Sequence, residues 1–117
     1  MPASPIVHIE LAAKDPAASS KFYADVFGWK IEVDPNFNYH QFFAEGGPPG
    51  GFNQIGENFK AGEVIPYLGT DDIEGTLKKV ERAGGKVSHP KEEIPGVGWF
   101  ALFFDPAGNR IGLFTRK

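Results

Sequence analysis

The chain has 117 residues, of which 41% are hydrophobic and none is cysteine. This length favours one compact domain over residues 1–117, and it excludes disulfides and thiolate metal sites. Twelve basic and fifteen acidic residues give a net charge of −3, without the basic cluster that nucleic-acid binding requires. Because there is no basic leader and no long apolar run, we expect a cytoplasmic protein without a membrane partner.

The first predicted elements lie in residues 6–32, which indicate a strand, a helix and a second strand. Asp15 is a residue type that accepts hydrogen bonds from the first amides of a helix, and Pro16 suits the first helical position. Gly28 favours a left-handed backbone that ends the helix. The apolar helix residues that share one stripe, and that we expect to be buried, are Ala18, Phe22 and Val26 with Tyr23 and Phe27 beside them.

The rest of the first half is rich in aromatic residues and is typical of strands at residues 38–44 and 50–56. Between these strands, the glycine and proline run at 46–51 predicts a loop without regular structure. Residues 56–63 are expected to link the two halves of the chain.

The second half repeats the pattern of the first. Residues 63–88 again indicate a strand, a helix and a strand, and residues 98–105 and 110–116 indicate two more strands. Identical residue types stand 57 positions apart in three pairs, namely Asp15 and Asp72, Lys21 and Lys78, and Gly28 and Gly85. The expected buried residues of the second helix are Ile73, Leu77 and Val80. Residues 88–93 read as a turn followed by a solvated charge run, and His40 and His89 as ordinary surface or strand residues.

Each half therefore predicts a β-α-β-β-β module. Module 1 covers about residues 4–56 and module 2 about residues 63–117 of one domain. The predicted fold class is α+β.

Two motifs point to a known family. The run FY-x-x-V-FGW at residues 22–29 and the turn DP-x-GN at residues 105–109 resemble the vicinal-oxygen-chelate superfamily of glyoxalases, bleomycin resistance proteins and dioxygenases. The resemblance covers nearly the whole chain. It implies two modules that form a curled eight-stranded cup with the helices outside, a small-molecule ligand inside, and a homodimer.

The resemblance also implies four positions for ligands of a divalent metal. His8 matches the first, but Ile65 and Gly112 stand at two others and cannot bind a metal. The fourth position lies near Phe52 or Asn53, where no carboxylate or histidine is available. Because a catalytic metal needs about three protein ligands, we expect no cofactor. A divalent ion such as Ni, Zn, Mn or Fe is expected only if His8 and Glu10 build a non-standard site.

Strand alternation predicts the lining of the implied cavity. Val7, Ile9 and Leu11 share one face, which we expect to meet the helix, whereas His8 and Glu10 lie on the other. The inward face of strands 38–44 and 98–104 stays open at this point. The expected ligand contacts are His8, Glu10, Tyr39, Gln41, Ile65, Tyr67, Phe100, Leu102 and Arg110.

These residues fit two functions from different classes. The first is a binding protein that sequesters a flat or cationic small molecule, as bleomycin resistance proteins do. The alternative is a glyoxalase-related lyase or isomerase, either metal-independent or with a non-standard metal site, in which Glu10 or His8 is the catalytic base and Tyr39 or Arg110 stabilises an enolate. A third interpretation makes His8 a structural histidine bonded to Glu10 or to backbone. The sequence leaves open the identity of the ligand, the occurrence of catalysis, and whether the modules pair within one chain or across a dimer.

Overall fold

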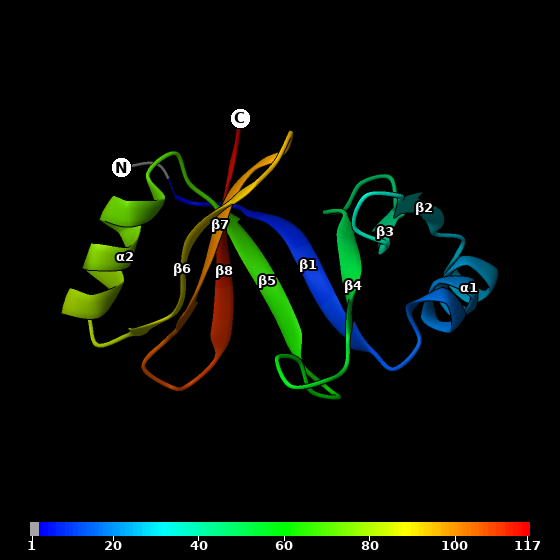
Figure 1. Cartoon of the computed structure of the whole chain (residues 1–117), viewed down its shortest axis with the longest axis horizontal. Coiled ribbons are helices and arrows are strands. Elements are labelled where there is room, and N and C mark those ends of the chain that lie inside the picture. The colour runs from blue at the N-terminus through cyan, green and yellow to red at the C-terminus, as the bar shows by residue number, and fades with distance from the viewer. Residues whose placement is uncertain (1–2) are drawn as a thin grey trace. The chain divides into compact units, whose positions relative to one another are not determined.

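The computed structural model describes residues 3–117 and divides them into two compact units. The N-terminal unit is His8–Ile65, and the C-terminal unit consists of the described residues up to Val7 together with Pro66–Lys117. The order of elements along the chain is β-α-β-β-β twice (Figure 1). The predicted α+β class with two such modules is confirmed.

The first module places one helix on one face of a four-stranded sheet. Its strand order is β2-β3-β4-β1, in which β1 and β4 are parallel and the other neighbours antiparallel. Helix α1 contacts β2, β3 and β4. The elements are β1 (Ile6–Ala13), α1 (Pro16–Phe27), β2 (Lys30–Asp34), β3 (Tyr39–Phe43) and β4 (Gly50–Gln54).

The second module repeats this topology. Its strand order is β5-β8-β7-β6, with β5 and β8 parallel and the other neighbours antiparallel, and α2 contacts β6, β7 and β8. The elements are β5 (Val64–Gly69), α2 (Ile73–Arg82), β6 (Lys86–Ile94), β7 (Gly98–Phe104) and β8 (Arg110–Arg116).

Each unit also holds the start of the other module's first strand. In the C-terminal unit, the Gly69 amide donates a hydrogen bond of 2.9 Å to the Pro5 carbonyl. In the N-terminal unit, the Ala12 amide donates one of 3.1 Å to the Glu63 carbonyl. Each of these two hydrogen bonds lies within one unit and joins the first strand of one module to the residue that precedes the first strand of the other.

The predicted starts of both helices and the predicted end of α1 are confirmed, whereas α2 ends at Arg82 with Ala83 as its cap, one residue before Gly84. The Asp15 carboxylate accepts hydrogen bonds from the Ala17 and Ala18 amides, and the Asp72 carboxylate accepts one from the Gly75 amide. Gly28 closes α1 with a φ of 72°, in the left-handed region that favours glycine. The same acidic cap thus begins the helix of both modules.

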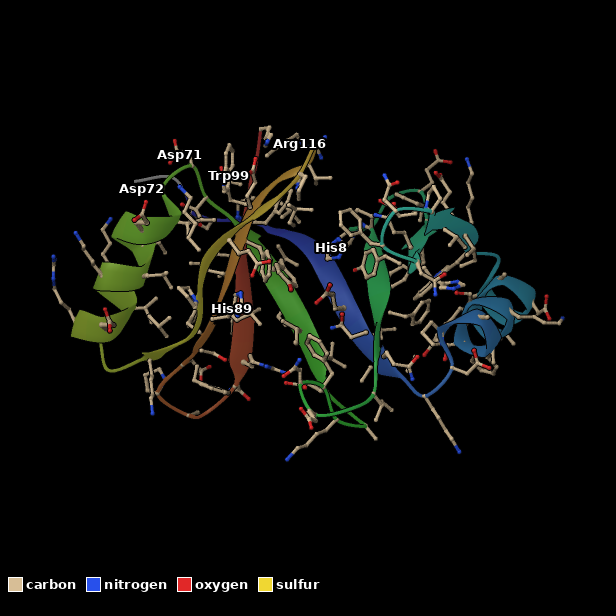
Figure 2. The ribbon with its side chains drawn as sticks, viewed as in Figure 1. His8, Asp71, Asp72, His89, Trp99 and Arg116 are labelled. Carbon is tan, nitrogen blue, oxygen red and sulfur yellow. The ribbon has the colours of Figure 1, made fainter. Side chains whose placement is uncertain are left out.

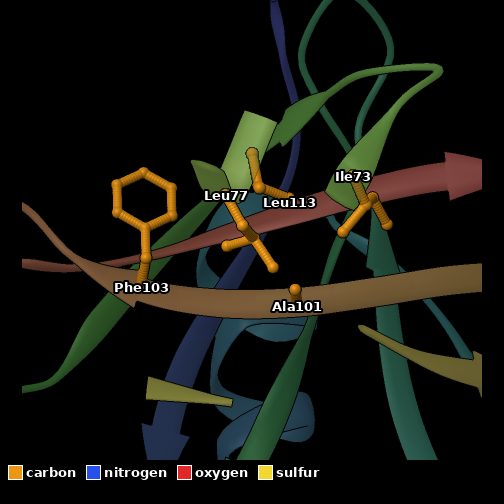
Figure 3. Close-up of a cluster of buried hydrophobic side chains, with 5 residues drawn as sticks. All are labelled: Ile73, Leu77, Ala101, Phe103 and Leu113. Atoms are coloured by element: carbon orange, nitrogen blue, oxygen red, sulfur yellow. The ribbon is translucent and has the colours of Figure 1, made fainter. Parts of the chain in front are cut away.

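The core of the C-terminal unit lies between α2 and its sheet (Figure 3). It is formed by Ile73, Leu77, Ala101, Phe103 and Leu113. The predicted burial of Ile73 and Leu77 is confirmed, and Val80 packs against this cluster. Because Ala101 and Phe103 face the helix, strand alternation places Phe100, Leu102 and Phe104 on the opposite face of β7. The helix side of β7 is therefore the side of Ala101 and Phe103.

The core of the N-terminal unit is more aromatic. Phe42 and Phe52 are 4% and 3% exposed, and Trp29 stacks on Phe42 with ring centroids 4.3 Å apart. Leu11, Tyr23 and Ile31 pack against the same cluster. Since Phe42 belongs to the helix side, Tyr39, Gln41 and Phe43 lie on the other face of β3.

The predicted buried stripe of α1 is wrong. Phe22 and Val26 are 54% and 58% exposed, and Ala18 is exposed as well, whereas Ser20 is turned inward and 4% exposed. Apolar residues occur all around this helix, so their spacing does not identify the packed face. Tyr23 decides it, because its ring stacks on Trp29 at 4.6 Å.

Two predicted irregular segments are partly strand. The glycine run at 46–51 was expected to form a loop throughout, but Gly50 and Gly51 begin β4 and are buried. Residues 88–93, expected to form a turn and a solvated charge run, belong to β6, and the charged residues 91–93 are exposed as expected. Pro90 is tolerated there because β6 ends its sheet order, and the register against β7 shifts on both sides of His89.

Neither helix within residues 3–117 is both long enough and apolar enough to cross a membrane.

Candidate functional site

A hydrogen-bonded network lies on the face of the N-terminal sheet that α1 does not cover. The Tyr39 hydroxyl donates a hydrogen bond of 2.9 Å to Oε2 of Glu10, and Nδ2 of Asn53 donates one of 2.9 Å to Oε1. Nε2 of His8 lies 2.9 Å from the Tyr39 hydroxyl and 3.9 Å from Oε2 of Glu10. Figure 2 labels His8, which comes from β1 together with Glu10. Three strands therefore supply one polar cluster.

Strand geometry explains why these side chains meet. Alternation places His8 and Glu10 on the same face of β1. Gly51 of β4 pairs in register with Glu10 on one side and with Gln41 on the other. Strand β4 therefore lies between β1 and β3, with Gly51 at the level of the Glu10 carboxylate.

Gly51 is required for the network. A Cβ atom at this position would lie 1.9 Å from the Tyr39 hydroxyl oxygen and 2.0 Å from the adjoining ring carbon. The phenol of Tyr39 thus lies directly over the glycine and occupies the space that any larger residue would need. This position of the ring brings its hydroxyl between His8 and Glu10.

Burial sets the protonation state of His8. Glu10 is 9% exposed, and the His8 side chain is 23% exposed. Burial lowers the pKa of His8, and the nearby Glu10 charge opposes this effect only in part, so His8 is neutral at pH 7. Because the Tyr39 proton is donated to Glu10, the Tyr39 oxygen accepts a hydrogen bond from Nε2–H of His8. Nδ1 then carries the lone pair of the neutral ring.

The C-terminal unit has a different arrangement at the corresponding positions. Gly112 of β8 pairs in register with Tyr67 of β5 and Leu102 of β7. A Cβ atom at Gly112 would lie 2.4 Å from the Tyr67 ring, so a tyrosine again covers the glycine. Tyr67 and Leu102 are 7% and 6% exposed. Tyr67 stands where the first module has Glu10.

This pairing corrects the predicted fourth metal position. The counterpart of Gly112 in the first module is Gly51, rather than Phe52 or Asn53, because Glu10 pairs with Gly51 as Tyr67 pairs with Gly112. This register could not be predicted from the sequence, because β4 begins inside the glycine and proline run and its first residue is not marked by a change in residue type.

The residues do not fit the divalent metal that the family resemblance implies. Two of the four positions are glycines whose Cβ space is filled by tyrosine rings, and a third is Ile65, which is 1% exposed. Within residues 3–117, no group of three or more His, Cys, Asp or Glu side chains is placed to hold a metal ion. One histidine with a carboxylate 3.9 Å away is not the ligand set of a catalytic ion.

The remaining predicted contacts are divided between the units. Gln41 lies in the N-terminal unit on the network face, beside Gly51. In the C-terminal unit, Phe100 stacks on His89 with ring centroids 5.2 Å apart, and Arg110 begins β8 opposite Phe104. His89, labelled in Figure 2, also pairs with Glu92 at 2.7 Å.

Asn53 is the network residue that the sequence interpretation did not assign to the site. It was considered only as a metal position and set aside because it is neither a carboxylate nor a histidine. Its hydrogen bond to Glu10 gives it a different role. Asn53 donates to one carboxylate oxygen, and Tyr39 donates to the other. Strand alternation places Asn53 on the same face as Gly51, which could have identified it. This inference requires knowing that Gly51 pairs with Glu10.

Comparison with known proteins agrees with this fold. The profile of the Glyoxalase/Bleomycin resistance protein/Dioxygenase superfamily matches residues 5–113. A glyoxylase-like domain-containing protein of Didymella fabae is 32% identical, over 92% of this chain and 91% of that protein. The anthracycline biosynthesis protein DnrV of Streptomyces peucetius is 31% identical over 92% of this chain, which spans only 45% of DnrV.

A solved structure gives the same result. The Mn(II)-bound glyoxalase from Novosphingobium aromaticivorans superposes with a TM-score of 0.69 and 26% identity, covering 97% of this chain and 39% of that one. The family profile covers nearly all of the sequence, and both β-α-β-β-β modules are present. The chain therefore belongs to the glyoxalase, bleomycin resistance protein and dioxygenase superfamily.

Proposed function

We propose that this superfamily member binds a small organic molecule at the network of His8, Tyr39, Glu10 and Asn53, without a metal. The proposed ligand is flat and carries a cationic group together with hydroxyl or carbonyl groups. The neutral His8 ring and the Glu10 carboxylate offer it hydrogen-bond acceptors, and the carboxylate attracts positive charge.

The observation that carries this proposal is the contrast between the two modules. A buried carboxylate costs free energy unless polar groups surround it, and the first module devotes a phenol and an amide to this purpose. The second module builds the same sheet with Tyr67 and Leu102 at the matching place. The fold therefore does not require Glu10, which supports a role for its network in recognition.

The name of one relative suggests which ligands to test. DnrV is named for anthracycline biosynthesis. Anthracyclines are flat, fused-ring molecules that carry hydroxyl groups, carbonyl groups and an amino sugar. Such a molecule matches a site with a carboxylate and a neutral imidazole.

The test is a fluorescence titration of the full chain with an anthracycline, repeated for the variants Glu10→Gln and Tyr39→Phe. We expect both variants to bind the cationic ligand about tenfold more weakly, because a charge-assisted interaction is lost or misplaced. The matched control is Glu92→Gln, which alters the exposed His89–Glu92 pair of the C-terminal unit and should leave affinity unchanged. Equal affinity in all four proteins, or no binding by the unmodified chain, would contradict the proposal.

A second candidate function is metal-independent proton transfer, as in a lyase or isomerase. The directions of the hydrogen bonds favour it. A proton taken from a substrate carbon by Nδ1 of His8 would be matched by transfer of the Nε2 proton to Tyr39 and of the Tyr39 proton to Glu10. The electron pair of the broken C–H bond stays on the substrate as an enolate.

Kinetics separates this candidate from simple binding. The probe is the hemithioacetal of glutathione and methylglyoxal, assayed in the presence of a strong chelator. An enzyme of this kind should turn the probe over with the chelator present, and Glu10→Gln should lower kcat while KM changes little. Absence of turnover, or turnover that the chelator abolishes, would rule out the proposed relay.

A further inference from the structure

Strand β3 carries two side chains on the network face that the network itself does not use. Strand alternation places Gln41 and Phe43 on the same face as Tyr39, at steps of about 7 Å along the strand. Both residues are partly exposed. Among residues 3–117, no polar group hydrogen-bonds to the Gln41 side chain and no aromatic ring stacks on Phe43. An amide and a phenyl ring beside the network are therefore available to a ligand.

Gln41 lies in one row with Gly51 and Glu10 across three strands. Gly51 of β4 pairs in register with Glu10 of β1 on one side and with Gln41 of β3 on the other. Because neighbouring strands lie about 5 Å apart, the backbones of Gln41 and Glu10 are about 10 Å from each other. A molecule of a few fused rings spans this distance. One flat ligand can therefore reach both the amide and the carboxylate.

The carboxylates on either side of Gln41 do not need its amide. Both oxygens of Glu10 already accept hydrogen bonds from the network. On the other side, Gln41 pairs in register with Glu32 of β2, whose carboxylate lies 3.7 Å from the Lys30 ammonium group. The amide therefore does not serve to hold a neighbouring charge.

The second module shows that the fold does not require an amide at this position. Leu102 pairs with Gly112 as Gln41 pairs with Gly51, and it is 6% exposed. The same sheet position thus accepts an apolar residue that packs. The exposed amide of the first module is better explained by contact with a ligand than by stability.

We propose that Gln41 determines specificity by hydrogen-bonding a carbonyl or hydroxyl group at the ring edge of the ligand. The ring packs against Phe43, and the cationic group approaches Glu10. This inference rests on the proposed function, because it assigns how the same site recognises the rest of its ligand. A primary amide both donates and accepts, so it suits a ring that carries carbonyl and hydroxyl groups. A ring without them gains nothing from the amide.

Three probes separate the two halves of the site in a fluorescence titration. An anthracycline carries ring carbonyls, ring hydroxyls and a cationic sugar, its aglycone keeps the rings without the sugar, and aminoacridine is a flat cation without either oxygen group. Gln41→Leu should weaken binding of the anthracycline and the aglycone about tenfold and leave that of aminoacridine unchanged. Glu10→Gln should weaken binding of the anthracycline and aminoacridine and leave that of the aglycone unchanged.

Two further variants serve as controls. Gln54→Leu makes the same chemical change on the helix side of the sheet, where alternation places Gln54 with the buried Phe52, and it should leave all three affinities unchanged. Gln41→Glu keeps the size of the side chain but removes its donor. It should weaken aglycone binding as Gln41→Leu does, whereas a role in shape alone would leave this affinity intact.

The outcomes distinguish this inference from the proposed function. Anthracycline and aglycone affinities that survive Gln41→Leu, with the expected response to Glu10→Gln, would overturn only the role of Gln41. An equal loss for all three probes in Gln41→Leu would overturn it as well, because aminoacridine has no group for the amide to bind. If Glu10→Gln affects none of the probes, or the unmodified chain binds none, the proposed function fails and this inference fails with it.

Discussion

The two modules share one topology but use their helices differently. Helix α2 has a charged outer face, and its inner face places Ile73 and Leu77 in the core. Helix α1 turns Ser20 inward and leaves Phe22 and Val26 exposed. The difference shows that helix amphipathicity is not fixed by the module, since aromatic stacking through Tyr23 and Trp29 secures α1 to its sheet.

The faces of the sheets without a helix differ in the same way. The first module places a carboxylate, a phenol, an amide and an imidazole there, whereas the second buries Tyr67 and Leu102. At the positions paired with the central glycine, the first module therefore has polar side chains and the second has an aromatic and an apolar one, while alternation places Arg110 on the same face of β8 as Gly112. Duplication of a module allows this division because each sheet retains its own core.

The largest expected effect separates the two helices. Leu77→Ala should lower the free energy of unfolding by about 2 to 5 kcal/mol, because it leaves a cavity in a packed core. Phe22→Ala should cost less than about 1 kcal/mol in dilute solution, because the side chain is already half exposed. Urea denaturation measures both. Similar losses for the two variants would mean that the exposed Phe22 side chain contributes to the stability of the fold.

The covered glycines should respond alike in both modules. Gly51→Ala and Gly112→Ala should each destabilise the fold by about 1 to 3 kcal/mol, because the new methyl group meets a tyrosine ring. Combining each change with Tyr39→Ala or Tyr67→Ala, respectively, should relieve most of the added cost. Urea unfolding of the single and double variants gives the coupling. An additive pair would show that the tyrosine is not the obstacle.

Removal of a helix cap should lower the free energy of unfolding by less than the glycine substitutions do, and by the same amount in both modules. Asp15→Ala and Asp72→Ala each remove a side chain that accepts hydrogen bonds from the first turn of a helix. We expect each to cost about 1 kcal/mol. Thermal or urea unfolding checks this. A difference well above the experimental error would reveal a further role for one of the two aspartates.

The free energy of unfolding should depend on pH below about 6.5 because of His8 in the first module. The pKa of His8 is lower in the folded protein than its ordinary value of 6.5. As the pH falls, His8 is therefore protonated in the unfolded chain at a higher pH than in the folded protein. The free energy of unfolding should therefore fall as the pH decreases below about 6.5 and level off below the folded pKa. His8→Gln should remove this component, whereas His89→Gln should not. A slope unchanged in His8→Gln would refute the assignment.

Asp105 serves as a reference for that experiment. Hydrogen bonds from Asn109 hold the pKa of its carboxyl below the ordinary value of 3.8. Its contribution is present above the unfolded pKa and is lost at lower pH, in a range separate from that of His8.

The sequence predicted features that depend on local chemistry. Asp15 and Asp72 begin their helices and Gly28 ends α1 as expected, because caps and left-handed turns use particular residue types. Alternation also placed His8 and Glu10 on one face of β1, whereas the face of Tyr39 stayed open until the helix side of β3 was known. These predictions need only neighbours along one strand or one helical turn.

Features that depend on register or tertiary packing were not predictable. The buried face of α1 could not be read from a helix whose apolar residues occur on all sides. The role of Asn53 required the pairing of Glu10 with Gly51, which the preceding glycines concealed. The bulged β6 through Pro90 likewise depends on its position at the end of the sheet order.

The tyrosines that cover Gly51 and Gly112 also limit how a metal site could be engineered into this chain. A carboxylate introduced at either glycine meets an aromatic ring from a neighbouring strand, so the single substitution destabilises the protein before it gains any function. A design that places a carboxylate at either position therefore needs a smaller residue in place of Tyr39 or Tyr67 as well, so each site could be gained only by two coupled substitutions.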